Sequence, residues 1–234
     1  EGEYANYLKQ LSGLNHINKG ISGGGICSNK QIKNAVMNTT DGKLDADLIT
    51  LEVRANDANC NWGTIYDSVD TDTFCGNLNA CIKYLQENTN AQIVIIGSPI
   101  TIMTTMNSNI FTPPEDRTTA NNLTVYDKNR LIEGVCQINC VYYIPLGECG
   151  GMGYYKQKSH INLTKDGVHP SKLGGYNIAQ FIWSKLKDIP LWYTSLPSYV
   201  QKFCTNIVLD NNTLSFTTKD SQTLTTTVTP TDTT

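Results

Sequence analysis

The sequence lacks the features that define several protein classes. It contains no run of 18 apolar residues, so we expect no membrane span. Its 18 basic residues are outnumbered by 21 acidic ones, for a net charge of −3, which argues against a nucleic-acid partner. The opening residues, Glu1-Gly2-Glu3-Tyr4, include no initiator Met and none of the basic and apolar segments of a signal peptide. We therefore expect a mature, trimmed or incomplete chain.

The eight cysteines include no Cys-x-x-Cys pair, so a zinc ribbon is not expected. Cysteines in this number favour small buried residues and one or two disulfides over a metal site. The residues Asp67, Asp70 and Asp72 suggest a calcium loop, but the loop lacks the glycine and the distal Glu of an EF-hand. A solvated loop is favoured there, and we expect neither a metal nor a cofactor.

Strand-like and helix-like apolar patterns alternate over residues 1–190. Strands are expected at 16–21, 47–53, 92–97 and 141–146, and helices at 4–11, 32–37, 74–85, 120–135 and 173–186. This alternation predicts an α/β domain with a parallel sheet covered by helices. In such a domain the ligand binds beyond the carboxyl ends of the strands.

Three short motifs fall at these expected strand ends. Gly23 offers an unhindered backbone N–H and Asn56 a neutral amide, and both are suitable donors to an oxyanion. Asp166 lies three residues before His169 in Asp-Gly-Val-His, where a carboxylate can orient a general base. The alternative is a structural role, in which His169 caps the final helix.

With these motifs in this order, residues 1–190 resemble the SGNH hydrolases, also called GDSL esterases and lipases. The resemblance implies a flavodoxin-like three-layer sandwich with a parallel sheet, and acyl transfer through a serine ester. It makes His169 the general base and Asp166 its orienter. It makes Gly23 and Asn56 the oxyanion donors.

The chain departs from the family pattern at two points. Arg54 stands where the family has a glycine, so we expect a cation that reshapes the pocket or contacts an anionic substrate. The family's Gly-Asp-Ser block is not found, and we expect it, with the nucleophilic serine and the first strand, upstream of residue 1. Ser22 is the alternative nucleophile, since residues 20–24 also fit the Gly-x-Ser-x-Gly elbow. An elbow normally follows several strands, which favours a plain turn or an oxyanion role for Ser22.

The composition changes after Pro190. Residues 191–206 are expected to be a linker, and residues 207–234 are rich in threonine with strand-like alternation. This tail is similar to the opening of a bacterial immunoglobulin-like domain of group 2. About 30 residues are too few to close such a sandwich. We therefore expect only the start of a second domain.

These features lead to two functional hypotheses. The first is a serine esterase that removes acetyl groups from a cell-surface carbohydrate, with Tyr154 and Tyr155 lining its sugar or acyl site unless they simply pack. The immunoglobulin-like tail suggests an extracellular location, on a bacterial surface or a virion, within a larger assembly. The second is a non-catalytic binding or structural module of a surface or phage tail protein.

Overall fold

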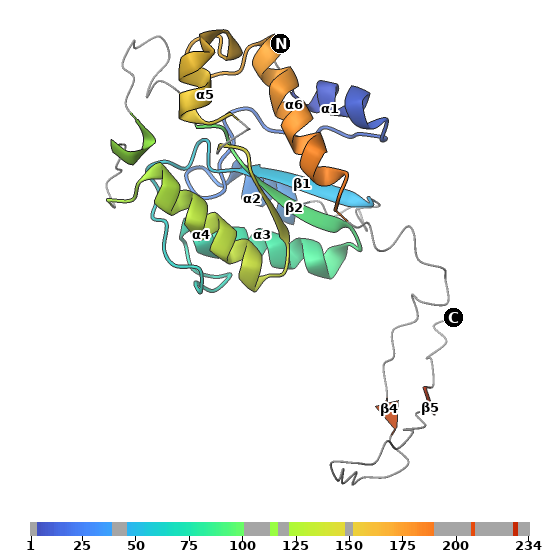
Figure 1. The fold of residues 1–234 in the computed structure, drawn as a ribbon. Helices are drawn as coiled ribbons and strands as arrows, with labels where there is room; N and C mark the ends of the chain where they lie inside the picture. Colours follow the sequence, from blue (N-terminus) through green and yellow to red (C-terminus); the bar gives the residue numbers. More distant parts are fainter. Residues whose placement is uncertain are drawn as a thin grey trace, which may run out of the picture. The chain divides into compact units, whose positions relative to one another are not determined.

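The computed structural model describes residues 4–38, 46–100, 113–116, 122–147, 152–189, 207–208 and 227–228. The chain divides into two units, Glu1–Leu191 and Trp192–Thr234, which are described separately. The first unit holds the sheet and the helices that pack on it (Figure 1).

The sheet of the first unit has three parallel strands in the order β1 (Leu48–Val53), β2 (Gln92–Gly97) and β3 (Tyr142–Pro145). The central strand β2 is almost wholly buried, as its uninterrupted apolar sequence predicts. The last residues of the three strands are aligned, since Val53 pairs with Gly97 and Gly97 with Pro145. The loops that follow the strands therefore leave from the same edge of the sheet.

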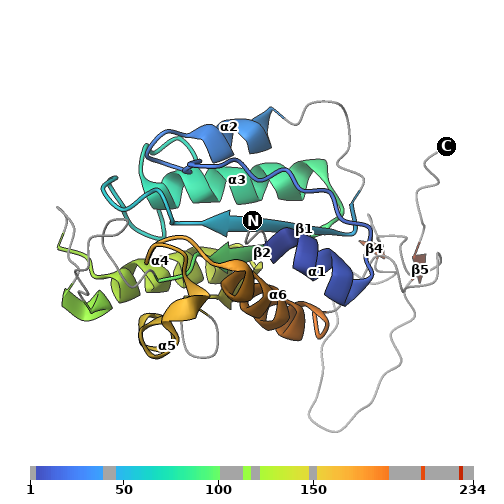
Figure 2. The same cartoon turned by 90° about the horizontal axis from the view of Figure 1, so that it is seen from above.

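Helices cover both faces of this sheet (Figure 1). Three of them pack with the core on one face: α2 (Gln31–Met37), α3 (Phe74–Asn88) and α4 (Val125–Ile138). The other face is covered by α1 (Tyr4–Ser12) and α6 (Lys172–Leu186), which lie side by side (Figure 2). The short elements are α5 (Tyr154–Ser159), η1 (Pro114–Asp116) and η2 (Ile161–Leu163). Within the described ranges, none of the helices combines the length and the apolar character needed to cross a bilayer.

The α/β architecture and its parallel sheet are confirmed, with three of the four expected strands in place. The expectation of a strand at 16–21 is wrong, because this segment forms no strand and its residues are mostly exposed, including Ile17 and Ile21. A strand needs a neighbour to satisfy its backbone groups, and the described part of the chain offers this segment none. The helix expected from 120 begins only at Val125, where Thr124 and Asp127 form a capping box.

In the second unit, β4 (Ile207–Val208) and β5 (Thr227–Val228) form an antiparallel pair. The other residues of the expected tail strands lie outside the described residues. The immunoglobulin-like assignment and the linker at 191–206 stay predictions.

Candidate active site

The turn that carries Asp166 and His169 is closed by its own residues. Thr164 and Pro170 form a β-bridge, and the N–H of Lys165 donates to the carbonyl of His169 at 2.8 Å. Between the two site residues, Gly167 has a φ of 82°, which a glycine adopts without steric cost. The turn therefore folds the chain back on itself and brings a carboxylate and an imidazole only three residues apart to the same side.

The carboxylate of Asp166 holds His169 through both of its oxygens. Oδ1 accepts the backbone N–H groups of Val168 at 3.0 Å and His169 at 2.7 Å, and Oδ2 lies 2.8 Å from Nδ1 of His169. Burial alone would raise the pKa of Asp166, but the hydrogen bonds from the backbone and ring of His169 outweigh it and lower this pKa to about 2.

An ionised Asp166 accepts a hydrogen bond from Nδ1–H of His169, which fixes the imidazole tautomer and leaves Nε2 for a reacting group. The His169 side chain is 60% exposed, whereas that of Asp166 is 15% exposed. Such a pair, with a protected orienter and an accessible imidazole, can perform general base catalysis.

The two expected oxyanion donors lie on loops that contact each other. The Asn56 side-chain amide donates to the carbonyl of Gly24 at 2.9 Å, which leaves its second N–H for another acceptor. Gly23 is exposed, with a φ of 71°, and within the described ranges its N–H has no hydrogen-bond acceptor. The structure thus brings Gly23 and Asn56 into one neighbourhood with donors to spare.

Asp57, which the sequence reasoning did not single out, joins these two loops. Its buried carboxylate accepts the backbone N–H groups of Ile26 at 3.1 Å and of Cys27 and Ser28 at 2.9 Å each. The approach is so close that a Cβ at Gly25 would come within 2.7 Å of Asp57 Oδ1. Burying a carboxylate is costly unless it is hydrogen-bonded, so these three bonds fix the backbone on both sides of the site.

Arg54 links the end of β1 to the end of β2. Its guanidinium Nη2 donates to the carbonyls of Ser98 and, at 2.9 Å, of Pro99. Its φ of 96° is a conformation that non-glycine residues rarely adopt, at the position where the resemblance expects a glycine. The structure shows a structural role for this cation, and a contact with substrate stays a prediction.

The Asp–His turn lies near the same edge of the sheet. Val168, inside the turn, packs against the buried cluster of Ile100 and Tyr154, and Ile100 follows the end of β2 by three residues. Ser98 and Pro99 directly precede Ile100, and Arg54 donates to the carbonyls of both. Arg54 itself lies two positions before Asn56. A continuous series of contacts therefore runs from the oxyanion loops to the Asp–His pair.

Lys128 is a second residue that the sequence did not reveal. This side chain on α4 is 3% exposed, and its Nζ donates to the carbonyl of Ala58 at 3.0 Å and lies 5.3 Å from the ring centre of Trp62. Burial, and then repulsion from Arg54, lower its pKa to about 8. A lysine at this spacing in a helix usually indicates a solvated face, so no sequence signal marks it.

The two tyrosines expected to line the site are separated. Both belong to α5. Tyr154 is only 1% exposed and packs with Ile100, so its assignment as a substrate-lining residue is corrected to a core position. Tyr155 is 58% exposed and donates to Glu115 at 2.6 Å, so it remains a candidate for substrate contact.

Neither Ser22 nor Ser98 has the geometry of a nucleophile. Ser22 lies in a turn closed by Gly24 N–H and the carbonyl of Ile21, and α2 begins only at Gln31, so the strand–turn–helix of an elbow is not formed. The buried Ser98 donates its hydroxyl to the carbonyl of Val53 at 2.8 Å.

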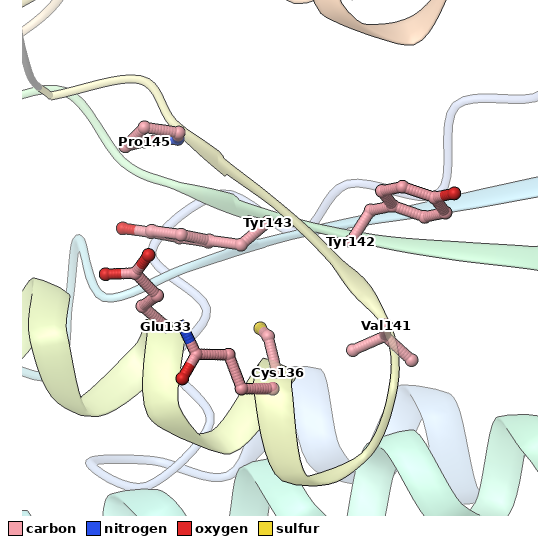
Figure 3. A pocket seen from close by; sticks show the side chains of 7 residues that line it. Glu133, Cys136, Val141, Tyr142, Tyr143 and Pro145 are labelled. Carbon is pink, nitrogen blue, oxygen red and sulfur yellow. The ribbon is translucent and has the colours of Figure 1, made fainter. Parts of the chain in front are cut away.

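A surface pocket of about 280 Å³ lies between α4 and β3, and none of the site residues described above lines it. Figure 3 shows Glu133 and Tyr143 facing each other within it, while Tyr142 points away. Neither Asp166 nor His169 lines it. The described residues also contain no group of three or more side chains placed to hold a metal ion.

Comparisons with known proteins give structural matches only. No family model matches the chain, and no curated protein matches it. A protein from Lactobacillus plantarum is 22% identical with a TM-score of 0.65, and the match covers 79% of this chain and 87% of that one. A further crystal structure is 21% identical with a TM-score of 0.67, over 80% of this chain and 86% of that one.

A third structure, described as a GDSL-like lipase from Parabacteroides merdae, is 17% identical with a TM-score of 0.51. That match covers 77% of this chain and 78% of the lipase. The likeness shows the fold. At this identity it assigns no residue a role, so the function depends on the geometry of the site.

Proposed function

We propose that this chain carries the Asp–His pair and the oxyanion loops of an SGNH-type serine esterase. The observation that carries the proposal is the contact of 2.8 Å between His169 Nδ1 and Asp166 Oδ2, in a histidine whose side chain is exposed. The GDSL-like lipase among the structural matches has the same fold, which is consistent with this chemistry.

The proposed reaction is acyl transfer. A serine Oγ attacks the ester carbonyl while His169 Nε2 takes its proton, and ionised Asp166 stabilises the imidazolium that forms. The Gly23 N–H and the second N–H of Asn56 donate to the oxyanion of the tetrahedral intermediate. His169 then returns the proton to the leaving alcohol, and water hydrolyses the acyl-serine in the same way.

The nucleophilic serine is proposed to come from residues that precede Glu1, on a strand beside β1. Among the described strands β1 pairs only with β2, so its other edge can accept a partner. Ile17 and Ile21, in the segment between α1 and α2, are 71% and 41% exposed. An added strand would be expected to bury apolar surface of this kind. Both features support a serine delivered at the end of an added strand.

We further propose acetyl esters on a cell-surface carbohydrate as substrates, with Tyr155 as a platform for a sugar ring. Tyr155 is 58% exposed as a residue, and aromatic rings of this kind pack against apolar faces. An extracellular location and a role within a surface or virion assembly belong to the same proposal and rest on the threonine-rich tail.

A covalent label tests the proposal in the natural protein, including any residues before Glu1. We expect a fluorophosphonate probe to modify one serine upstream of Glu1, and His169→Ala to abolish both this labelling and the turnover of p-nitrophenyl acetate. His160→Ala is the matched control, because this exposed histidine lies outside the proposed site and should leave turnover unchanged.

Two outcomes would overturn the assignment. Turnover that survives His169→Ala would remove the general base, and labelling at Ser22 would move the nucleophile. If the natural protein has no serine there and no activity, the non-catalytic binding module is the correct interpretation.

A further inference from the structure

Two cysteines lie at the junction of the two oxyanion loops. Cys27 belongs to the loop after Gly23, and Cys60 to the loop after Asn56. Both are half-buried, and after burial itself the hydrogen-bonding side chain of Cys27 is the main cause that raises the pKa of the Cys60 thiol. The sulfur of Cys27 also lies 3.9 Å from the carbonyl oxygen of Asn61, the residue next to Cys60.

The backbone around both cysteines is held in place independently of the thiols. The Asp57 carboxylate accepts the N–H of Cys27 at 2.9 Å, and the Asp57 carbonyl accepts the N–H of Cys60 at 3.4 Å and its thiol at 3.1 Å. A disulfide needs Cα atoms about 4.4–6.8 Å apart and Cβ atoms that face each other. Because both backbones are bonded to the same residue, Asp57, the two cysteines are held close together, and side-chain rotation then brings their sulfurs to each other.

The other described cysteines are poorer partners. Cys75, Cys81 and Cys136 are fully buried, and burial raises the pKa of each to about 12, so little reactive thiolate forms. Cys140, which follows the end of α4, is a free and exposed cysteine. Within the described ranges, Cys27 and Cys60 also belong to no group of three or more side chains that could hold a metal ion.

We propose that Cys27 and Cys60 form a disulfide under oxidising conditions, which ties the loop of Gly23 to the loop of Asn56. In the reaction, a small-molecule disulfide such as oxidised glutathione accepts two electrons and two protons from the two thiols. One sulfur–sulfur bond forms in the protein, the bond of the oxidant breaks, and two glutathione thiols leave.

The link should form slowly at neutral pH. Burial, followed by the contact with Cys27 and the charge of Asp57, raises the pKa of the Cys60 thiol well above its ordinary range. Because exchange proceeds through a thiolate, oxidation should be faster at pH 9 than at pH 7. Once formed, the link closes a loop of about 30 residues and should raise the melting temperature by about 5 °C.

Disulfide mapping in the natural protein tests this inference. The reduced protein is incubated with oxidised glutathione, the remaining thiols are alkylated, and the proteolytic fragments are weighed. We expect a Cys27–Cys60 cross-linked peptide, and a rise in melting temperature that dithiothreitol reverses. Cys60→Ser should lose both effects, whereas the matched control Cys140→Ser should keep both.

A link from Cys27 to Cys75 or to any other cysteine would overturn the pairing. So would full alkylation of Cys27 and Cys60 after prolonged oxidation at pH 9. The effect of the link on the oxyanion donors rests on the proposed function, and there we expect a changed p-nitrophenyl acetate rate on oxidation. The mapping needs no activity, so a protein without esterase activity still confirms or refutes the disulfide.

Discussion

Replacing Asp166 by Asn removes one charge and keeps the shape of the turn. The amide oxygen of Asn can still accept the backbone N–H groups of Val168 and His169, which now bond to Oδ1 of Asp166. What is lost is the carboxylate oxygen 2.8 Å from His169 Nδ1. Asp166→Asn therefore isolates the Asp–His interaction from the rest of the turn.

The expected loss of stability follows from the pKa of Asp166. A folded-state pKa of about 2 against an ordinary value of 3.8 corresponds to about 2 kcal/mol at neutral pH. The His169 side chain is 60% exposed, and solvent screening reduces this to on the order of 1 kcal/mol.

The sign of the pH dependence is fixed because the folded-state pKa is depressed. The stabilisation is complete above the unfolded-state value and is lost as the pH falls through about 2. The gap between wild type and Asp166→Asn should therefore shrink by about half between pH 7 and pH 3.

Urea unfolding at pH 7 and pH 3, followed by circular dichroism, measures this gap. Asp70→Asn is the matched control, because Asp70 is exposed and should give no gap at either pH. A gap that stays constant with pH, or an Asp166→Asn variant as stable as the wild type, would refute the reasoning. In an active natural protein the same variant should also lower kcat by about 100-fold or more, because His169 loses its fixed tautomer.

Three further predictions concern the loops around the site, and each is measured by urea unfolding. Arg54→Gly should be more stable than Arg54→Ala by about 1 kcal/mol. Both variants lose the bonds to Ser98 and Pro99, but only glycine adopts the φ of 96° without strain. Equal stabilities would show that no strain is stored at this position. Asp57→Asn should lower the free energy of unfolding by about 2 kcal/mol or more, since the amide NH₂ of Asn would face a backbone N–H. An unchanged stability would contradict the three-bond geometry. The wild type should become more stable as the pH rises from 8 to 10, because the folded-state pKa of Lys128, about 8, lies below its ordinary value of 10.5. Lys128→Met should remove this gain. Identical pH profiles of the two proteins would count against a buried cation.

The sequence predicted those parts of the fold that depend on local patterns. The apolar run Gln92–Gly97 gave the central strand, and the apolar spacing gave the helix Phe74–Asn88, whose first nine residues are all buried. The capping box at Thr124 and Asp127 was also readable, and it marks the start of α4 better than the apolar pattern did. The segment 16–21 has the composition of a strand, but pairing is a tertiary property that composition does not contain.

The site shows the same division. The contact between Asp166 and His169 was predictable from sequence because it is made within one turn of seven residues, from Thr164 to Pro170. Asp57 and Lys128 were not found, because their roles consist of contacts with residues that are distant in sequence. Tyr154 was misplaced because an aromatic residue beside glycines gives no indication of which side faces the core.

The two halves of the candidate site differ in how far apart in sequence their contacts reach, so they should respond differently to substitution. The Asp–His half is closed by its own backbone bonds, such as the one from Lys165 N–H to the His169 carbonyl, and needs few distant partners to keep its geometry. The oxyanion half depends on Asp57 bonds that span about 30 positions of the chain. Substitutions that disrupt the loops of Gly23 and Asn56 should therefore remove donors to the oxyanion while the His169 imidazole stays correctly oriented. In the proposed esterase, such variants would lose turnover yet keep the pH dependence that Asp166 gives to stability, which separates the two halves by experiment.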